Sequence, residues 1–141
     1  MRTERAILDT GPLVAFFREQ DAHHAWAVKT FQRLELPFVT CEAVLAEACY
    51  ILRRDPTAQE KLFKFVADRY FDFRFHLAEH LEEVTKLMRK YCSIPASLAD
   101  ACLVRTAELH DNLSVFTLDT HFRIYRKHGR QVIPLMMPDE S

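Results

Sequence analysis

Four acidic residues stand in apolar surroundings, namely Asp9, Glu47, Asp100 and Asp119. Burying a carboxylate is costly unless a cation or hydrogen-bond donors compensate its charge. Carboxylates that gather also repel one another and raise each other's pKa. A hard divalent cation such as Mg²⁺ or Mn²⁺ removes that cost. Such an ion can activate water and neutralise developing charge, so the four acids predict a metal site for hydrolysing a phosphodiester or phosphomonoester.

Each of these acids also has an ordinary structural role open to it. Asp9 and Asp119 precede predicted helical segments, where an aspartate caps the backbone. Asp100 completes a Ser97-x-x-Asp pattern, which resembles a capping box. Glu47 lies at the edge of an apolar stripe and can be a partly exposed helix acid. A helical wheel nevertheless places Asp100 on the apolar side of its helix, which favours a site.

Other chemistries are disfavoured. The cysteines form no Cys-x-x-Cys pair and no zinc-finger spacing, so we expect reduced, mostly buried thiols. His23 and His24 are adjacent and diverge by ~100° on a helix, so they cannot easily share one metal. Two glycines in the chain are too few for a phosphate-binding loop or a dinucleotide fingerprint. A haloacid-dehalogenase-like phosphatase needs an aspartate where this chain has Gly11.

Short apolar runs alternate with amphipathic stretches, a pattern typical of an α/β domain with helices on both faces of a parallel sheet. We expect a single domain over 1–141. Strands are expected at 6–8, 37–40, 71–76, 114–118 and 131–135. Helices are expected at 12–17, 22–34, 41–53, 56–70, 77–91, 97–110 and 120–127. The alternation of 71–76 favours an edge strand with one buried face.

The predicted elements would bring the acids together. Asp9 and Asp119 follow two buried strands, and ligands bind at the carboxyl ends of strands in open α/β sheets. Glu47 and Asp100 lie on helices that can lean over the same edge. In the helix of Glu47 the apolar stripe includes Ile51, and Phe63 belongs to the apolar set of the helix that follows.

Bulk composition does not point to nucleic acid. The chain has 141 residues, is 49% hydrophobic and carries a net charge of −1, which is ordinary for a globular domain. A local basic cluster follows Asp119 and predicts phosphate contacts. Its members are Arg123, Arg126, Lys127 and Arg130. The same residues would also suit the C-terminus of a helix.

We expect a cytoplasmic protein. Charged residues, Arg2 among them, precede a first apolar run that is too short for a signal peptide. No stretch approaches the ~20 apolar residues that a membrane span requires.

Several short motifs together resemble the PIN-domain ribonucleases. They are Ile7-Leu8-Asp9-Thr10-Gly11-Pro12-Leu13, Glu47 within a helix, Ser97-Leu98-Ala99-Asp100-Ala101 and Thr117-Leu118-Asp119. The match is closest to small single-domain bacterial members, which include VapC-like toxins of toxin–antitoxin pairs and stand-alone relatives. The resemblance implies a three-layer α/β/α fold with a mostly parallel sheet of about five strands.

The resemblance also implies a site and an activity. Asp9, Glu47, Asp100 and Asp119 would bind Mg²⁺ or Mn²⁺, and Thr10 and Thr117 would be supporting hydroxyls. The activity would be metal-dependent endoribonuclease cleavage of RNA, typically by a homodimer. An antitoxin would lie in the groove between the early helices and push a basic residue toward the acids. The alternatives are a stand-alone nuclease in RNA processing and a non-catalytic RNA- or partner-binding module, against which the intact acid set argues.

Overall fold

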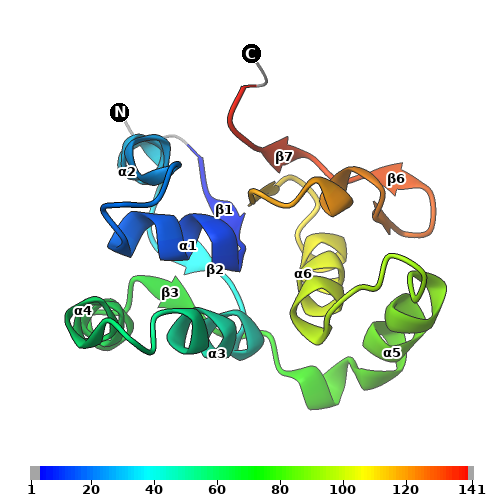
Figure 1. The fold of residues 1–141 in the computed structure, drawn as a ribbon. Coiled ribbons are helices and arrows are strands. Elements are labelled where there is room, and N and C mark those ends of the chain that lie inside the picture. Colours follow the sequence, from blue (N-terminus) through cyan, green and yellow to red (C-terminus); the bar gives the residue numbers. More distant parts are fainter. Residues whose placement is uncertain (1–3, 140–141) are drawn as a thin grey trace.

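The computed structural model describes residues 4–139, so Arg2 and both ends of the expected 1–141 domain lie outside the described part. A five-stranded, fully parallel sheet forms the centre, in the order β3-β2-β1-β4-β7 (Figure 1). Its strands are β1 (Ala6–Leu8), β2 (Phe38–Val39), β3 (Phe71–Asp72), β4 (Ser114–Phe116) and β7 (Leu135–Met136). The parallel sheet of about five strands is therefore confirmed.

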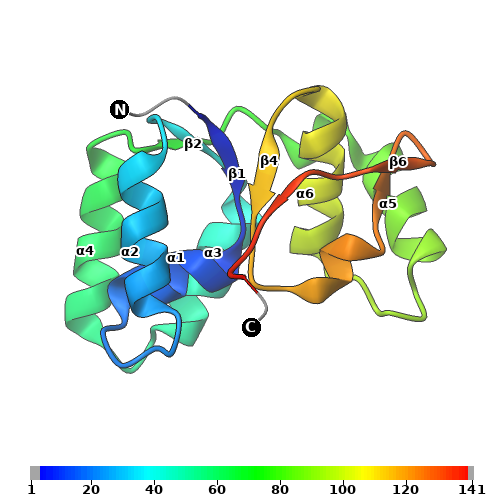
Figure 2. The same cartoon turned by 90° about the horizontal axis from the view of Figure 1, so that it is seen from above.

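Within residues 4–139, six α-helices flank the sheet and complete the three-layer α/β/α fold. Their bounds are α1 (Thr10–Phe17), α2 (His24–Arg33), α3 (Glu42–Ile51), α4 (Pro56–Ala67), α5 (Leu81–Lys90) and α6 (Leu98–Leu109). Figure 2 shows α1, α2 and α4 on one side of β1 and β4, with α5 and α6 on the other. Two short 3₁₀ segments, η1 (Leu77–Glu79) and η2 (Thr120–Arg123), join the elements.

Strand β1 is central because its three residues are fully apolar and have no exposed surface. Ile7 is in register with Val39 of β2 on one side and with Val115 of β4 on the other. Burial on both faces is typical of a strand in a parallel sheet covered by helices. The carboxyl ends of β1 and β4 therefore lie next to each other.

Four predicted elements were wrong in extent, among them the helix at 77–91, which is divided into η1 and α5. Strand β3 ends at Asp72 rather than continuing to residue 76, because the backbone N–H and the guanidinium of Arg74 turn back onto the Asp72 carboxylate. The run 131–135 divides between β7 and β6 (Gln131–Val132), which pairs antiparallel with β5 (Arg126–Lys127) in a separate sheet. The helix predicted at 120–127 stops with η2, and β5 takes up its last two residues.

Two predicted core side chains are exposed. Ile51 is 42% exposed and Phe63 is 51% exposed. Ile51 lies in the last turn of α3, and Phe63 points away from the core because its neighbour Leu62, which is ~100° away on the helix, takes the buried face. Within residues 4–139 no helix is long and apolar enough to cross a membrane.

Candidate active site

The four predicted acids line one cavity of about 380 Å³. Asp9 follows β1 and Asp119 follows the strand paired with it, β4, whereas Glu47 and Asp100 come from helices α3 and α6. The structure therefore brings together acids that are separated by up to 110 positions in the chain (119 − 9). Their role in catalysis stays a prediction.

Asp9 is the most deeply buried of the four, with 6% of its surface exposed. Its Oδ1 accepts a hydrogen bond from the backbone N–H of Thr10 at 2.8 Å, so it caps α1. Its Oδ2 accepts a hydrogen bond from the hydroxyl of Thr117 at 2.6 Å. The capping role and the cavity role are therefore compatible in one side chain.

The two predicted hydroxyls connect the acids. The hydroxyl of Thr10 donates to Oε2 of Glu47 at 3.0 Å. The hydroxyl of Thr117, besides donating to Asp9, accepts a hydrogen bond from the backbone N–H of Asp119 at 2.9 Å. Thr10 thus orients the α3 acid, and Thr117 sets the spacing between the two strand-end acids.

Asp100 serves its helix as well as the cavity. The backbone N–H of Asp100 donates to the Ser97 hydroxyl at 3.0 Å, and Oδ2 of Asp100 accepts from the Ser97 backbone N–H at 3.3 Å. The capping box that the sequence offered as an alternative is therefore present. The same Oδ2 accepts a hydrogen bond from the hydroxyl of Tyr125 at 3.1 Å.

Asp119 is the most open of the strand-end acids. Its Oδ1 accepts a hydrogen bond from the backbone N–H of His121 at 2.9 Å and lies 3.3 Å from Nδ1 of that imidazole. The alternative role as a cap, here of η2, is therefore also present.

Electrostatics oppose the ionised form of Asp9. The pKa of Asp9 is raised from 3.8 to about 7, mainly by burial, and the nearby negative charges of Asp100 and Asp119 act in the same direction. The hydrogen bonds from Thr117 and Thr10 lower it, but they offset only part of the cost of burial. A positive charge close to Asp9 would offset this penalty.

A model of one protein family matches most of the chain. The family is described as PIN domain, and the match covers residues 6–127, which include all four acids. The chain belongs to the PIN-domain family. No curated protein matches the chain significantly. PIN domains are usually nucleases that use divalent metals, so membership supports a nuclease-type function.

The side chains of this PIN domain fit a divalent cation by donor type and charge. The hydrogen bonds that Asp9 accepts come from neutral donors, which leaves its negative charge without a cationic partner among them. Carboxylate and hydroxyl oxygens are the ligands that Mg²⁺ and Mn²⁺ prefer. Among residues 4–139, however, no three Asp, Glu, His or Cys side chains are arranged to ligate one ion.

Sequence reasoning missed Arg18 and Tyr125. Arg18 lines the acidic cavity and its Nη2 donates to the backbone carbonyl of Ile51 at 3.1 Å. Its place directly after the helix that Asp9 caps was a usable signal. Tyr125 has no exposed surface, and its pairing with an acid 25 positions away leaves no local pattern in the sequence.

Two side chains of the basic cluster, Arg126 and Lys127, make hydrogen bonds within this PIN domain. Nη1 of Arg126 donates to the backbone carbonyls of residues 123–125, which is the role at a helix end that the sequence left open. Lys127 is buried, and its ammonium group donates to the carbonyl of Asp111 at 2.9 Å. The ammonium group of Lys127 is therefore engaged within the protein, whereas Arg123 and Arg130 are exposed. Phosphate binding by the cluster stays a prediction.

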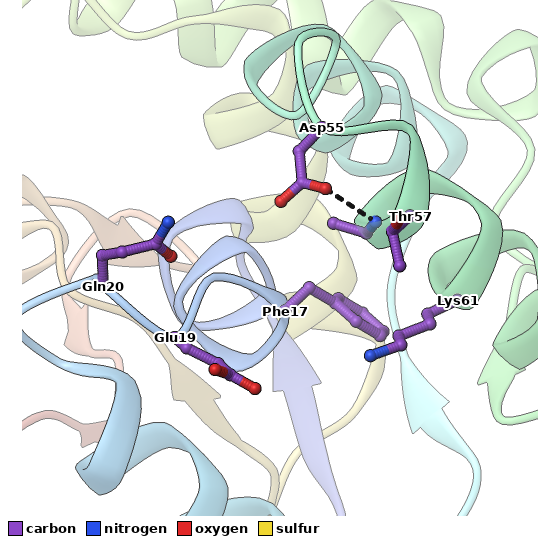
Figure 3. A pocket seen from close by; sticks show the side chains of 7 residues that line it. Phe17, Glu19, Gln20, Asp55, Thr57 and Lys61 are labelled. Carbon is purple, nitrogen blue, oxygen red and sulfur yellow. Dashed lines mark hydrogen bonds between the residues drawn. The ribbon is translucent and has the colours of Figure 1, made fainter.

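A second cavity, of about 460 Å³, lies between the end of α1 and the start of α4 (Figure 3). Asp55 there caps α4 through a hydrogen bond from the backbone N–H of Ala58 at 3.1 Å. Glu19 and Lys61 add charges of both signs to its lining. Although this cavity is larger, Asp55 and Glu19 are the acids in its lining, against the four predicted acids at the other cavity, so the candidate site is the acidic cavity.

Proposed function

We propose that this PIN domain is a divalent-metal-dependent endoribonuclease that hydrolyses phosphodiester bonds of RNA. The observation that carries the proposal is the gathering of four acids from four elements at one cavity, with the buried Asp9 lacking a cationic partner among its hydrogen bonds. Membership of a family of nucleases adds to it.

Asp9, Glu47, Asp100 and Asp119 would hold Mg²⁺ or Mn²⁺. A bound ion of this kind lowers the pKa of water and neutralises charge that develops on a phosphate. Thr10 and Thr117 orient the carboxylates through the hydrogen bonds described above. The buried side of the cavity keeps Asp9 from bulk water and so strengthens its electrostatic interactions.

The test is cleavage of single-stranded RNA by the purified chain with and without Mn²⁺. We expect cleavage that requires the metal and is lost in Asp9→Asn and in Asp100→Asn, while circular dichroism shows that both variants are folded. Asp68→Asn is the matched control, because Asp68 is an exposed acid at the C-cap of α4 and is paired with Lys64. Cleavage that survives in both cavity variants contradicts the assignment.

We further propose that the protein is the toxin of a type II toxin–antitoxin pair, acting in the cytoplasm as a homodimer. An apolar cavity of about 190 Å³ supports a partner at the early helices, because it opens between α1, α2 and α4 and can receive an apolar side chain. Its lining is mostly aromatic: Phe16, Phe31, Gln32, Leu36, Phe38, Phe65 and Tyr70. A stand-alone nuclease would have no partner there.

Expression of the chain separates these roles. A toxin arrests growth, and co-expression of the small gene next to its own gene relieves the arrest. Normal growth on expression of an RNA-cleaving chain favours the stand-alone nuclease. Light scattering of the purified protein tests the homodimer.

A further inference from the structure

Two arginines converge on neighbouring carbonyl groups at the end of α3. Nη2 of Arg18 donates to the carbonyl of Ile51 at 3.1 Å, and Nη1 of Arg53 donates to the carbonyl of Tyr50 at 2.9 Å. Cations at a helix C-terminus are stabilised by the helix dipole. A guanidinium has five N–H donors, so each arginine keeps donors for a further anion.

Tyr50 presents an aromatic face at the same place. The guanidinium carbon of Arg53 lies 4.0 Å from the centre of the Tyr50 ring, on one face. The residue nevertheless stays 63% exposed, so the opposite face is open to solvent. An exposed aromatic ring backed by an arginine is a platform on which a planar group can stack.

This platform adjoins the acidic cavity. Tyr50 comes three residues after Glu47 on α3, so their side chains are neighbours on the helix surface. The next residue, Ile51, lines the cavity, as does Arg18. The end of α3 therefore carries an aromatic face and two positive charges at the border of a cavity whose own acids repel phosphate.

Single-stranded RNA matches this combination. Its unpaired bases stack on aromatic side chains, and its phosphates pair with guanidinium groups. Resting on the nuclease function proposed above, we propose that the end of α3 is a subsite for a nucleotide next to the scissile phosphate. Its base stacks on Tyr50, and its phosphate binds Arg18 and Arg53.

The first test is RNA binding in EDTA, which prevents metal-dependent cleavage. A fluorescein-labelled single-stranded RNA of 12 nucleotides is titrated with the full chain and followed by anisotropy. We expect Tyr50→Ala to weaken binding about tenfold, within the range of stacking losses on alanine substitution. Tyr50→Phe keeps the affinity of the native chain. Phe63→Ala is the matched control, because Phe63 is an exposed aromatic of α4 outside the lining of the acidic cavity.

A set of RNAs with one abasic nucleotide at successive positions separates stacking from a structural effect. With the native chain, an abasic nucleotide at one position should weaken RNA binding about tenfold. With Tyr50→Ala, an abasic nucleotide at that position should cause no further loss of affinity. Arg53→Gln should reduce the slope of log affinity against log salt by about 0.7, the value for one phosphate contact on a single strand. Lys86→Gln, which removes a surface charge from α5, should leave the slope unchanged.

Three results would overturn the subsite. Equal binding by Tyr50→Ala and the native chain, or an abasic effect that persists in Tyr50→Ala, removes stacking on this ring. A changed oligomeric state in Tyr50→Ala with unchanged RNA binding makes the end of α3 a protein interface instead. If the native chain still cleaves RNA with Mn²⁺ in these cases, only the subsite fails. A native chain that neither binds nor cleaves RNA contradicts the nuclease function itself.

Discussion

The hydroxyl of Thr117 donates a hydrogen bond to Oδ2 of Asp9 at 2.6 Å, across 108 positions of the chain. The hydroxyl oxygen of Thr117 in turn accepts a hydrogen bond from the backbone N–H of Asp119 at 2.9 Å. One side chain therefore links the two acids that follow β1 and β4. It also favours the ionised form of Asp9, because its hydrogen bond lowers the pKa that burial raises.

Replacement of Thr117 should change the pH dependence of cleavage. In Thr117→Val the pKa of Asp9 rises above its native value, so the acid limb of the pH–rate profile moves to higher pH. The lost hydrogen bonds should also cost about 1 kcal/mol of stability. Thr117→Ser retains the hydroxyl and should keep the native profile. If the acid limb of the pH–rate profile lies at the same pH in Thr117→Val and in the native chain, ionisation of Asp9 does not control the rate.

Asp9 should destabilise the metal-free fold at neutral pH. Its folded pKa, about 7, lies above the unfolded value near 3.8, so the native chain loses stability as pH rises between these values and stays less stable above them. Asp9→Asn has no such titration. Urea unfolding in EDTA at pH 8 should find the variant more stable by about 2–4 kcal/mol, with the difference shrinking toward pH 4. A difference that does not vary with pH contradicts the burial argument.

Asp72 should stabilise the edge of the sheet with a pH dependence opposite to that of Asp9. The guanidinium of Arg74 donates to Asp72 at 2.6 Å and 3.0 Å and lowers the pKa of that carboxyl. Stability from this contact is present above the unfolded pKa and is lost as pH falls through the folded one. Arg74→Ala should therefore be less stable than the native chain at pH 6–7 and equal to it near pH 2. Thermal unfolding across this range makes the comparison, with Arg89→Ala as a surface control on α5.

The sequence was most informative where a local pattern of apolar residues agrees with the position that the segment takes in the sheet. The run Ala6–Leu8 is apolar on both faces, so it predicts a central buried strand, and the acid after it must then stand at the carboxyl edge of the sheet. The same reasoning located Asp119 after β4. Asp9, Asp100 and Asp119 also cap helical segments, so the same residues fit both a capping pattern and the predicted metal site.

The sequence was least informative where contacts between distant segments decide the outcome. The alternation at 71–76 predicted a longer strand, but Arg74 turns back onto Asp72 and ends the pairing. The sequence predicted that Lys127 contacts phosphate, or alternatively lies at a basic helix end, but its ammonium group donates to the carbonyl of Asp111, 16 positions earlier in the chain. Ile51 fits the apolar stripe of α3 by spacing, although it borders a cavity rather than the core.

Binding of Mn²⁺ to the purified, RNA-free chain tests the central claim most directly, because free Mn²⁺ is counted by electron paramagnetic resonance. We expect saturable binding to the native chain and to Asp68→Asn, with affinity reduced at least tenfold in Asp9→Asn and in Asp100→Asn. Unchanged Mn²⁺ affinity in both cavity variants would contradict it, since the gathered carboxylates would then not be the metal ligands.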